Sequence, residues 1–225
     1  MAERIIKIEN LYHVYKGIVE TVALKGVNME INKKDFLLII GKSGSGKTTL
    51  LHCLAGMIRP TAGHIYFNDE DITQYSDEIL TEYRRKSIGI VYQNLNLIDW
   101  LTVEENIEVP MIIANKSKKE RKKRVDELLE YFDIKRYKNQ FPSFLSGGEQ
   151  QRVAVAVALA NEPEVILADE PTGNLDLENA KNVYELFKQL NKEKSVTIIL
   201  ATHDLNATRY ANRIYDLTTY KFQSQ

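Results

Sequence analysis

The chain has 225 residues, 44% of them apolar, and its 30 basic and 31 acidic side chains leave a net charge of −1. Length and apolar content predict one large globular domain, and the balanced charge argues against a general nucleic-acid binder. The single cysteine, Cys53, excludes an internal disulfide and is typical of a reducing compartment. Its helical spacing after a glycine-rich loop favours a small core residue over a redox sensor.

No segment is long enough to cross a membrane as a helix. The longest apolar runs, residues 36–40 and 153–160, fall short of the roughly 18 to 20 residues that a span requires. The N-terminus leads directly into a strand-like pattern, which predicts that no signal peptide is present. A role at the membrane therefore requires a partner protein.

The first part of the chain reads as strands around one helix. Residues 4 to about 34 alternate apolar and polar side chains, which predicts antiparallel strands. Residues 36–40 form a buried strand that feeds the glycine-rich loop, and a helix is expected over 47–55. Short strands are expected at 65–67 and 88–92.

From about residue 95 to residue 140 the pattern becomes helical. One apolar stripe follows the positions i, i+3, i+4 and i+7, namely Val125, Leu128, Leu129 and Phe132. The basic run at 118–124 opens this helix. It favours a solvated helix face over a patch for RNA or anionic lipid.

The last part of the chain alternates strands and helices. The expected elements are a strand at 165–168, a helix at 177–191, a strand at 196–201, a helix at 205–211 and a strand at 213–217. Such alternation predicts a mostly parallel sheet with helices on its faces, and hence an α/β fold.

A phosphate-binding loop lies between the buried strand and the helix that follows it. Its glycines allow backbone N–H groups to close around phosphate oxygens, and the helix N-terminus adds positive potential. Lys47 is placed to contact the β- and γ-phosphates, and Thr48 offers a hydroxyl to Mg²⁺. The expected nucleotide contacts are Gly41, Lys42, Ser43, Gly44, Ser45, Gly46, Lys47, Thr48 and Thr49.

Two acids, Asp169 and Glu170, end the apolar strand at 165–168, and Pro171 stops that strand at once. Adjacent side chains on a strand point to opposite faces. One carboxylate can therefore hold a metal ion while the next faces an attacking water.

A third motif, LSGGE at residues 145–149, lies between the other two. Ser146 stands where a helix N-cap is expected, and Gly147 and Gly148 follow it. A capping serine with exposed backbone N–H groups is an anion-binding arrangement.

The order and spacing of the three motifs resemble those of the ATP-binding-cassette (ABC) ATPases, from residue 10 to about residue 217. Residues 145–153 and 168–176 are most similar to the branch for lipoprotein release, macrolide export and peptide-antibiotic resistance. The resemblance implies that Asp169 holds Mg²⁺ and that Glu170 is the general base.

Further roles are implied by the same resemblance. Gln93 would contact the metal and the water, His203 would touch the γ-phosphate, and Asp176 lies in the loop that links two sites across a dimer. Tyr15 would stack on adenine, with Tyr12 as its competitor. The signature motif (Ser146, Gly147 and Gly148) would meet the ATP of a partner copy.

The resemblance implies one P-loop ABC domain over 1–225. Its core, about 1–94 and 161–225, would combine a mostly parallel sheet with an antiparallel β sub-domain. A helical sub-domain would cover about 95–160.

We therefore expect an ATPase that binds ATP and Mg²⁺ and forms an ATP-dependent head-to-tail homodimer. It would drive an integral-membrane permease subunit or a mechanotransmission partner, from a cytoplasmic position on the inner face of the cell membrane, and no nucleic-acid partner is expected. The alternatives are a soluble ABC ATPase that acts on nucleic acid or the ribosome, and a nucleotide-dependent scaffold.

Three further features bear on partners and on the C-terminus. The family usually has arginine where Val157 stands, and residues 216–220 lack the usual Asp-Gly turn, which predicts a shortened final hairpin. Residues 94–103 are apolar for a connection and contain Trp100. They are interpreted either as local core or as a groove for a helix of the membrane subunit.

Overall fold

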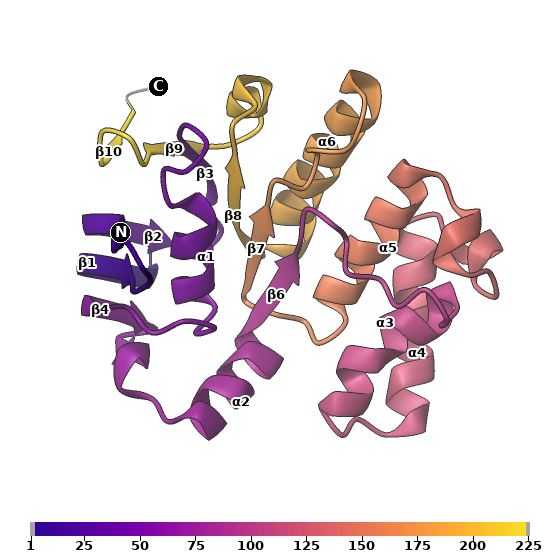
Figure 1. Cartoon of the computed structure of the whole chain (residues 1–225). Coiled ribbons are helices and arrows are strands. Elements are labelled where there is room, and N and C mark those ends of the chain that lie inside the picture. The colour runs from indigo at the N-terminus through magenta and orange to yellow at the C-terminus, as the bar shows by residue number, and fades with distance from the viewer. Residues whose placement is uncertain (1–2, 224–225) are drawn as a thin grey trace.

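The computed structural model describes residues 3–223 and contains two sheets (Figure 1). The six-stranded sheet has the order β10-β9-β3-β8-β7-β6, parallel except where β10 pairs with β9. Its strands are β3 (Phe36–Ile40), β6 (Ile88–Val91), β7 (Val165–Asp169), β8 (Thr197–Thr202), β9 (Arg213–Asp216) and β10 (Lys221–Phe222). The expected α/β class and mostly parallel sheet are confirmed.

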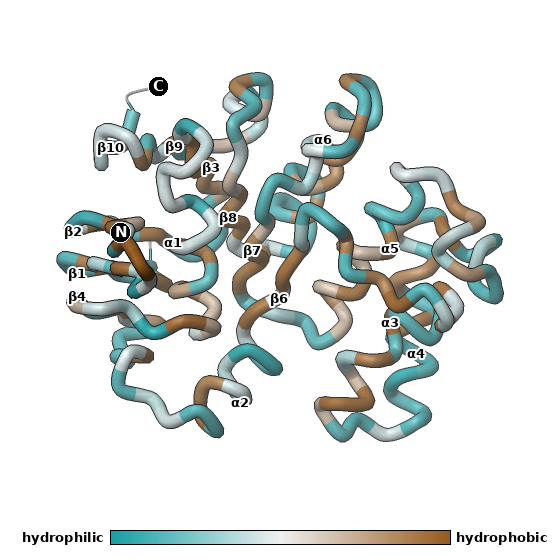
Figure 2. Tube along the Cα trace, viewed as in Figure 1, coloured by the Kyte–Doolittle hydropathy of each residue, from teal (hydrophilic) through white to brown (hydrophobic). Residues whose placement is uncertain are grey.

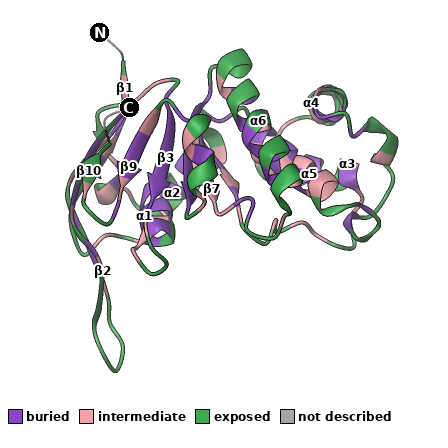
Figure 3. Cartoon of the chain, turned by 90° about the horizontal axis from the view of Figure 1, so that it is seen from above, coloured by how far each residue is buried: buried purple, intermediate pink, exposed green. Residues whose placement is uncertain are grey.

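The second sheet is antiparallel and has the order β2-β1-β4-β5. Its strands are β1 (Arg4–Tyr15), β2 (Thr21–Asn32), β4 (Ala62–Phe67) and β5 (Glu70–Asp71). The alternating pattern at residues 4 to about 34 therefore indicated β1 and β2 correctly, the short strand expected at 65–67 is part of β4, and β5 was not predicted. The loop that joins β1 to β2 projects from the molecule and is exposed (Figure 3).

Alternate residues of β3 face two different cores. Phe36, Leu38 and Ile40 join a cluster with the helices α3 to α6, whereas Leu37 and Ile39 join a cluster with α1 (Lys47–Leu54) and the antiparallel sheet. The two faces follow from the two-residue repeat of a strand. Strands β6, β7 and β8 are accordingly hydrophobic along much of their length (Figure 2).

Cys53 lies in the second of these clusters and is almost completely buried. Burial raises the pKa of its thiol to about 12. A thiol in that state is a poor nucleophile at neutral pH, because the thiolate is the reactive form. The interpretation of Cys53 as a core residue is confirmed.

Three helices form a lobe on the opposite side of the six-stranded sheet from β1 and β2 (Figure 1). They are α3 (Val103–Ile113), α4 (Lys118–Tyr131) and α5 (Gly147–Leu159). Each begins with a capping box, in which Ser or Thr and a Glu three residues later satisfy each other's backbone N–H groups. The apolar stripe predicted around Val125 is buried.

Residues 95–102 differ from the helical expectation. Leu95 and Asn96 adopt positive φ angles of 59° and 50°, and the first helix of the lobe starts only after Thr102. Short 3₁₀ turns at Lys135–Tyr137 and Pro142–Phe144 connect α4 to α5.

Two other elements depart from the sequence reading. Helix α2 (Asp77–Ser87) was not predicted, although Ser76 caps it and its charges run from acidic to basic, as suits the helix dipole. The helix expected at 205–211 is wrong: Leu205–Arg209 is a 3₁₀ turn. The side chain of Asp204 accepts from the backbone N–H of Asn206, which favours a tight turn over an α-helix.

Helix α6 (Leu177–Lys194) connects β7 to β8, and a 3₁₀ turn at Ile72–Gln74 precedes α2. The final hairpin is short, as predicted, since β10 contributes two residues and Tyr220 in the turn has a φ of 58°. Among residues 3–223, no helix is both long and apolar enough to span a bilayer.

Candidate nucleotide-binding and catalytic site

The loop between β3 and α1 has the backbone that its glycines permit. Gly44 and Gly46 adopt φ angles of +77° and +95°, which side-chain-bearing residues rarely take. A Cβ at Gly46 would lie 2.3 Å from the carbonyl oxygen of Ala23 on β2. Any other residue at position 46 would therefore push the loop away from the antiparallel sheet.

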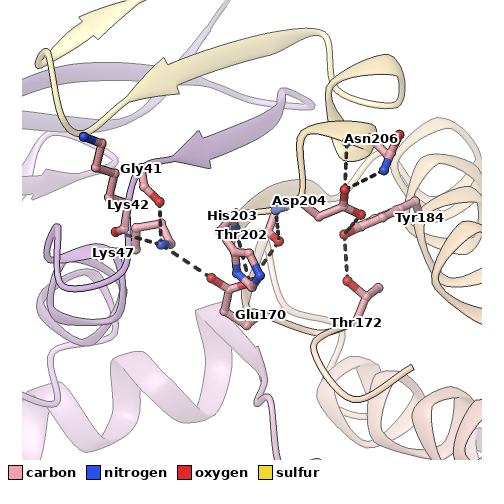
Figure 4. Close-up of polar contacts among 10 residues, drawn as sticks. All are labelled: Gly41, Lys42, Lys47, Glu170, Thr172, Tyr184, Thr202, His203, Asp204 and Asn206. Atoms are coloured by element: carbon pink, nitrogen blue, oxygen red, sulfur yellow. Dashed lines mark hydrogen bonds and ion pairs between the residues drawn. The ribbon is translucent and has the colours of Figure 1, made fainter. Parts of the chain in front are cut away.

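Lys47 is only 7% exposed and turns back over the loop. Its Nζ donates to the carbonyl oxygen of Gly41 at 2.9 Å and lies 3.4 Å from Oε1 of Glu170 (Figure 4). One ammonium group thus connects the glycine-rich loop to the acid at the end of β7.

A cavity of about 590 Å³ opens in front of this loop. The residues that line it are Tyr15, Thr21, Ala23, Ser43, Gly44, Ser45, Gly46, Lys47, Thr48, Thr49, Gln93, Glu170 and His203. The structure therefore brings together four expected residues that are distant in sequence: Tyr15, Gln93, Glu170 and His203. Gln93, Glu170 and His203 follow β6, β7 and β8, which are adjacent parallel strands, so their C-terminal ends share one edge of the sheet with β3 and the P-loop. Tyr15 reaches the same cavity from the end of β1 in the antiparallel sheet.

Glu170 is held by one of its two carboxylate oxygens. Its Oε2 accepts from Oγ1 of Thr202 at 2.9 Å and from the backbone N–H of His203 at 3.3 Å, and it lies 3.0 Å from Nδ1 of His203. The backbone of Glu170 has a φ of 43°, a sparsely populated conformation that is typical of functional sites. The imidazole of His203 is 70% exposed and faces the cavity mouth.

Asp169 points to the other face of β7, next to α1. Its Oδ1 is buried and has no hydrogen-bond partner among the described residues. Burial raises the pKa of its carboxyl group, and the Thr48 hydroxyl opposes that rise. An unpartnered buried carboxylate oxygen beside a hydroxyl suits a hard cation with oxygen ligands.

The oxygen donors available here fit Mg²⁺ better than a metal that needs a full protein cage. In the part of the chain that the structure describes, no cluster of three or more His, Cys, Asp or Glu side chains could hold a metal by itself. Mg²⁺ is usually bound by one or two carboxylates together with substrate phosphates, which is compatible with the expected ligands Asp169, Thr48 and Gln93.

The two tyrosines that compete for the base differ in position. Tyr15 lines the cavity, and its hydroxyl lies 3.2 Å from Oγ1 of Thr49. Tyr12 is not among the cavity residues and lies against Gly26, where a Cβ would be 2.8 Å from its hydroxyl. The geometry favours Tyr15.

The signature motif lies at a different cavity, of about 210 Å³. Ser146 and Gly148 line it together with Asn179, but none of its lining residues belongs to the P-loop cavity. The Oγ of Ser146 donates to Glu149 at 2.7 Å, and Asp176 caps α6 by accepting from the backbone N–H of Asn179 at 2.9 Å. The structure therefore does not bring Ser146, Gly147, Gly148 or Asp176 to this chain's own P-loop.

Sequence reasoning missed three polar residues near the acid: Thr202, Asp204 and Tyr184. They connect to Glu170 through hydrogen bonds (Figure 4). In the sequence, Thr202 and Asp204 could have been found because they lie on either side of His203, whereas nothing near Tyr184 indicates its contact with them.

A glycine-rich loop from strand to helix, with acids ending a parallel strand of the same sheet, one strand away across β8, is typical of a P-loop nucleotide-binding ATPase. The model of the ABC transporter family matches residues 24–173, which is more than half of the chain. The chain belongs to this family.

Relatives and solved structures agree with that assignment. An uncharacterised ABC transporter ATP-binding protein of Methanocaldococcus jannaschii is 43% identical, with 94% of this chain and 95% of that protein covered. The lipoprotein-releasing system ATP-binding protein LolD 1 of Rhodopseudomonas palustris is 44% identical, with 87% of each covered. The dimeric post-hydrolysis structure of the ATP-binding cassette MJ0796, bound to ADP and Pi, superposes with a TM-score of 0.85 at 42% identity, covering 94% of this chain and 93% of that one.

These comparisons confirm an ATP-binding subunit of the ABC transporter type that hydrolyses ATP. They also confirm the resemblance to the lipoprotein-release branch, since several of the relatives are LolD proteins. The alternatives of a nucleic-acid or ribosome enzyme and of a non-hydrolysing scaffold receive no support from them.

Proposed function

We propose that two copies of the chain close head to tail around two Mg-ATP, and that hydrolysis at both sites drives a membrane permease. The observation that supports a dimer is that the P-loop and the signature motif line two separate cavities with no residue in common. One copy cannot present both surfaces to the same γ-phosphate. A two-fold arrangement lets each surface complete the site of the other copy, and the similar cassette MJ0796 is dimeric with ADP and Pi.

Within each site, the residues divide the work between binding and chemistry. The loop N–H groups and Lys47 hold the phosphates, and Tyr15 offers its ring face to the base. When bound, Mg²⁺ would neutralise charge on the phosphates, with Asp169, Thr48 and Gln93 as the residues that hold it. Glu170 takes the proton of the attacking water.

The ion pair between Lys47 and Glu170 must break before Glu170 can take a proton from the attacking water. Their atoms lie 3.4 Å apart, so the ammonium group competes with a water for Oε1 of the acid. Phosphate oxygens offer Lys47 a stronger charge-assisted contact. Nucleotide binding would thus draw Lys47 towards the phosphates and leave Oε1 free to accept a proton.

A mostly apolar groove of about 470 Å³ is our candidate site for the permease. It lies between α2, β6, α3 and α5, and its lining includes Tyr92, Ile113, Val157 and Ala158. Valine at position 157, where the family usually has arginine, makes the groove less polar. Trp100 is 79% exposed and does not line this groove, so the segment at 94–103, expected either as local core or as the groove itself, would form a separate surface.

Docking of a permease segment in this groove would place the chain on the cytoplasmic side of the membrane as a peripheral subunit. Affinity capture from detergent-solubilised membranes of the source cells tests this, with Ile113→Asp as the variant, because Ile113 lines the groove and is exposed, and with Trp100→Ala as the comparison. We expect Ile113→Asp to lose the membrane protein and Trp100→Ala to retain it. Loss with Trp100→Ala alone would move the interface to residues 94–103.

The dimer is tested by light scattering of Glu170→Gln in saturating Mg-ATP, because a variant that binds but hardly hydrolyses ATP should accumulate the closed pair. We expect a doubling of the molar mass on ATP addition and none with Glu170→Gln combined with Lys47→Ala. A monomer at high protein concentration in Mg-ATP would overturn the proposal.

A further inference from the structure

The hydroxyl group of Thr202 is buried at the point where β8 ends. Thr202 is only 1% exposed, and its backbone pairs in register with Ile40 of β3. Its Oγ1 donates to Oε2 of Glu170 at 2.9 Å. The strand that carries this hydroxyl lies at the centre of the sheet, so the donor has little freedom to move.

A second set of hydrogen bonds holds the turn that follows Thr202. The backbone N–H of Asp204 donates to Oγ1 of Thr202 at 3.0 Å, and the hydroxyl of Tyr184 donates to Oδ2 of Asp204 at 3.1 Å. Tyr184 also lies 2.7 Å from Oγ1 of Thr172. Figure 4 shows this chain of contacts running from α6 to Glu170.

The direction of each donor follows from the number of protons available. An ionised Asp204 carboxylate only accepts, so Tyr184 must give it its one proton, and Thr172 must then donate to Tyr184. Burial raises the pKa of Tyr184 to about 12, which keeps this hydroxyl a donor at neutral pH. On the other side, the Thr202 hydroxyl accepts from the backbone N–H of Asp204 and donates its own proton to Oε2 of Glu170.

We propose that Thr202 is a positioning residue for the general base Glu170. Tyr184 holds the turn after Thr202 and thereby fixes the position of the Thr202 hydroxyl. This inference rests on the proposed role of Glu170. Thr202 fixes Oε2, and the opposite oxygen, Oε1, is thereby aimed at the cavity, where it meets Lys47. His203 also contacts Oε2, but its exposed imidazole is free to turn towards a γ-phosphate, whereas Thr202 keeps its contact.

The test compares steady-state ATP hydrolysis of Thr202→Val, Thr202→Ser and Tyr184→Phe with that of the wild-type chain. Valine keeps the shape of the side chain and removes the hydroxyl, and we expect kcat to fall roughly 10- to 100-fold, the range of one hydrogen bond to a charged group. KM for ATP should stay within about twofold, because Thr202 does not line the nucleotide cavity. Serine should restore most of kcat, and Tyr184→Phe should lower it by a few fold.

Thr208→Val serves as the matched control. Among residues 3–223 its hydroxyl bonds only to the carbonyl oxygen of Leu205 in the same turn, so its loss should leave kcat unchanged. In a Glu170→Gln background, Thr202→Val should have no further effect on turnover, because its influence passes through Glu170.

Three outcomes would overturn the inference: unchanged kcat in folded Thr202→Val, no rescue by serine, or a further loss of the same size in the Glu170→Gln background. If Thr202→Val fails to fold, the result for Tyr184→Phe decides, and unchanged kcat there counts against the network. Failure of the proposed role of Glu170 would look different, because Glu170→Gln would then itself retain near-normal turnover.

Discussion

The P-loop surface and the signature surface of this chain contrast in how complete they are. At the P-loop, Tyr15 of β1 and the residues that directly follow β6, β7 and β8 converge with Lys47 on one cavity. At the signature motif, Ser146 caps the start of α5 and Gly148 lies in its first turn, at a separate small cavity that neither Lys47 nor Glu170 lines.

The difference shows how one chain makes ATP binding and ATP hydrolysis separable. A single copy has what it needs to bind the nucleotide. In the dimer that we propose, the second surface would act only when another copy supplies the γ-phosphate, so hydrolysis would require assembly. Four variants test this division between the two surfaces.

The largest effect is expected from Glu170→Gln on the P-loop surface. Loss of a general base costs roughly 10²- to 10⁴-fold in turnover, while ATP binding should persist because the loop and Lys47 are unchanged. Phosphate release measures the first and equilibrium nucleotide binding the second. Glu178→Gln, at the exposed start of α6, is the control and should keep full turnover. Near-normal hydrolysis by Glu170→Gln would remove this residue from its role.

Tyr15→Ala should weaken ATP binding by about 1 to 3 kcal/mol, the scale of base–aromatic stacking. Since Tyr15 belongs to the P-loop surface, the loss should already appear in the monomer. Titration calorimetry with Lys47 intact measures it, and Tyr12→Ala is the matched comparison. A loss with Tyr12→Ala but not with Tyr15→Ala would reverse the assignment.

Ser146→Ala probes the signature surface, where two effects must be separated. Removing a capping serine costs about 1 kcal/mol of stability. Ser117→Ala removes the same capping box from α4, far from any phosphate, and should cause the same loss. Only Ser146→Ala should also lower turnover, by roughly tenfold, with monomer ATP binding unchanged. Equal turnover of the two variants would show that Ser146 only caps its helix.

The smallest effect concerns stability. The raised pKa of Asp169 means that its ionised form is disfavoured in the folded state, so the charge costs stability above the folded pKa and nothing below the unfolded value of about 3.9. Asp169→Asn should therefore raise the free energy of unfolding at pH 7 without Mg²⁺, because the amide carries no charge that folding would bury. This gain should shrink as the pH falls towards 4. Denaturant titrations at both pH values check the sign, and a gain that grows on acidification would refute it.

Much of the site was predictable because its motifs are local. The backbone geometry of the loop at 41–48 and of the acids at 169–170 is determined by residues that are adjacent in sequence. The strand that precedes each motif and the turn that follows it lie within a few positions of it. The capping boxes of α4 and α5 are equally local, since each satisfies its bonds within four residues. Helix α2 was not predicted, although its N-cap Ser76 and its charge pattern are visible in the sequence. The turn after Asp204 was predicted as a helix because the hydrogen bond from the backbone N–H of Asn206 to the Asp204 side chain leaves no mark in the hydrophobic pattern.

By itself, the sequence determined the α/β class, the phosphate loop, the paired acids and the family, because hydrophobic period and short motifs reside in contiguous residues. Only the tertiary structure decided that Tyr15 rather than Tyr12 faces the loop, that Trp100 lies outside the apolar groove, and that Tyr184 and Thr202 reach Glu170. These contacts depend on the order of the strands in the sheet and on which side chains of each strand point into the core. Residues more than a hundred positions apart become neighbours through β3, β8 and β7, and no local pattern records that adjacency.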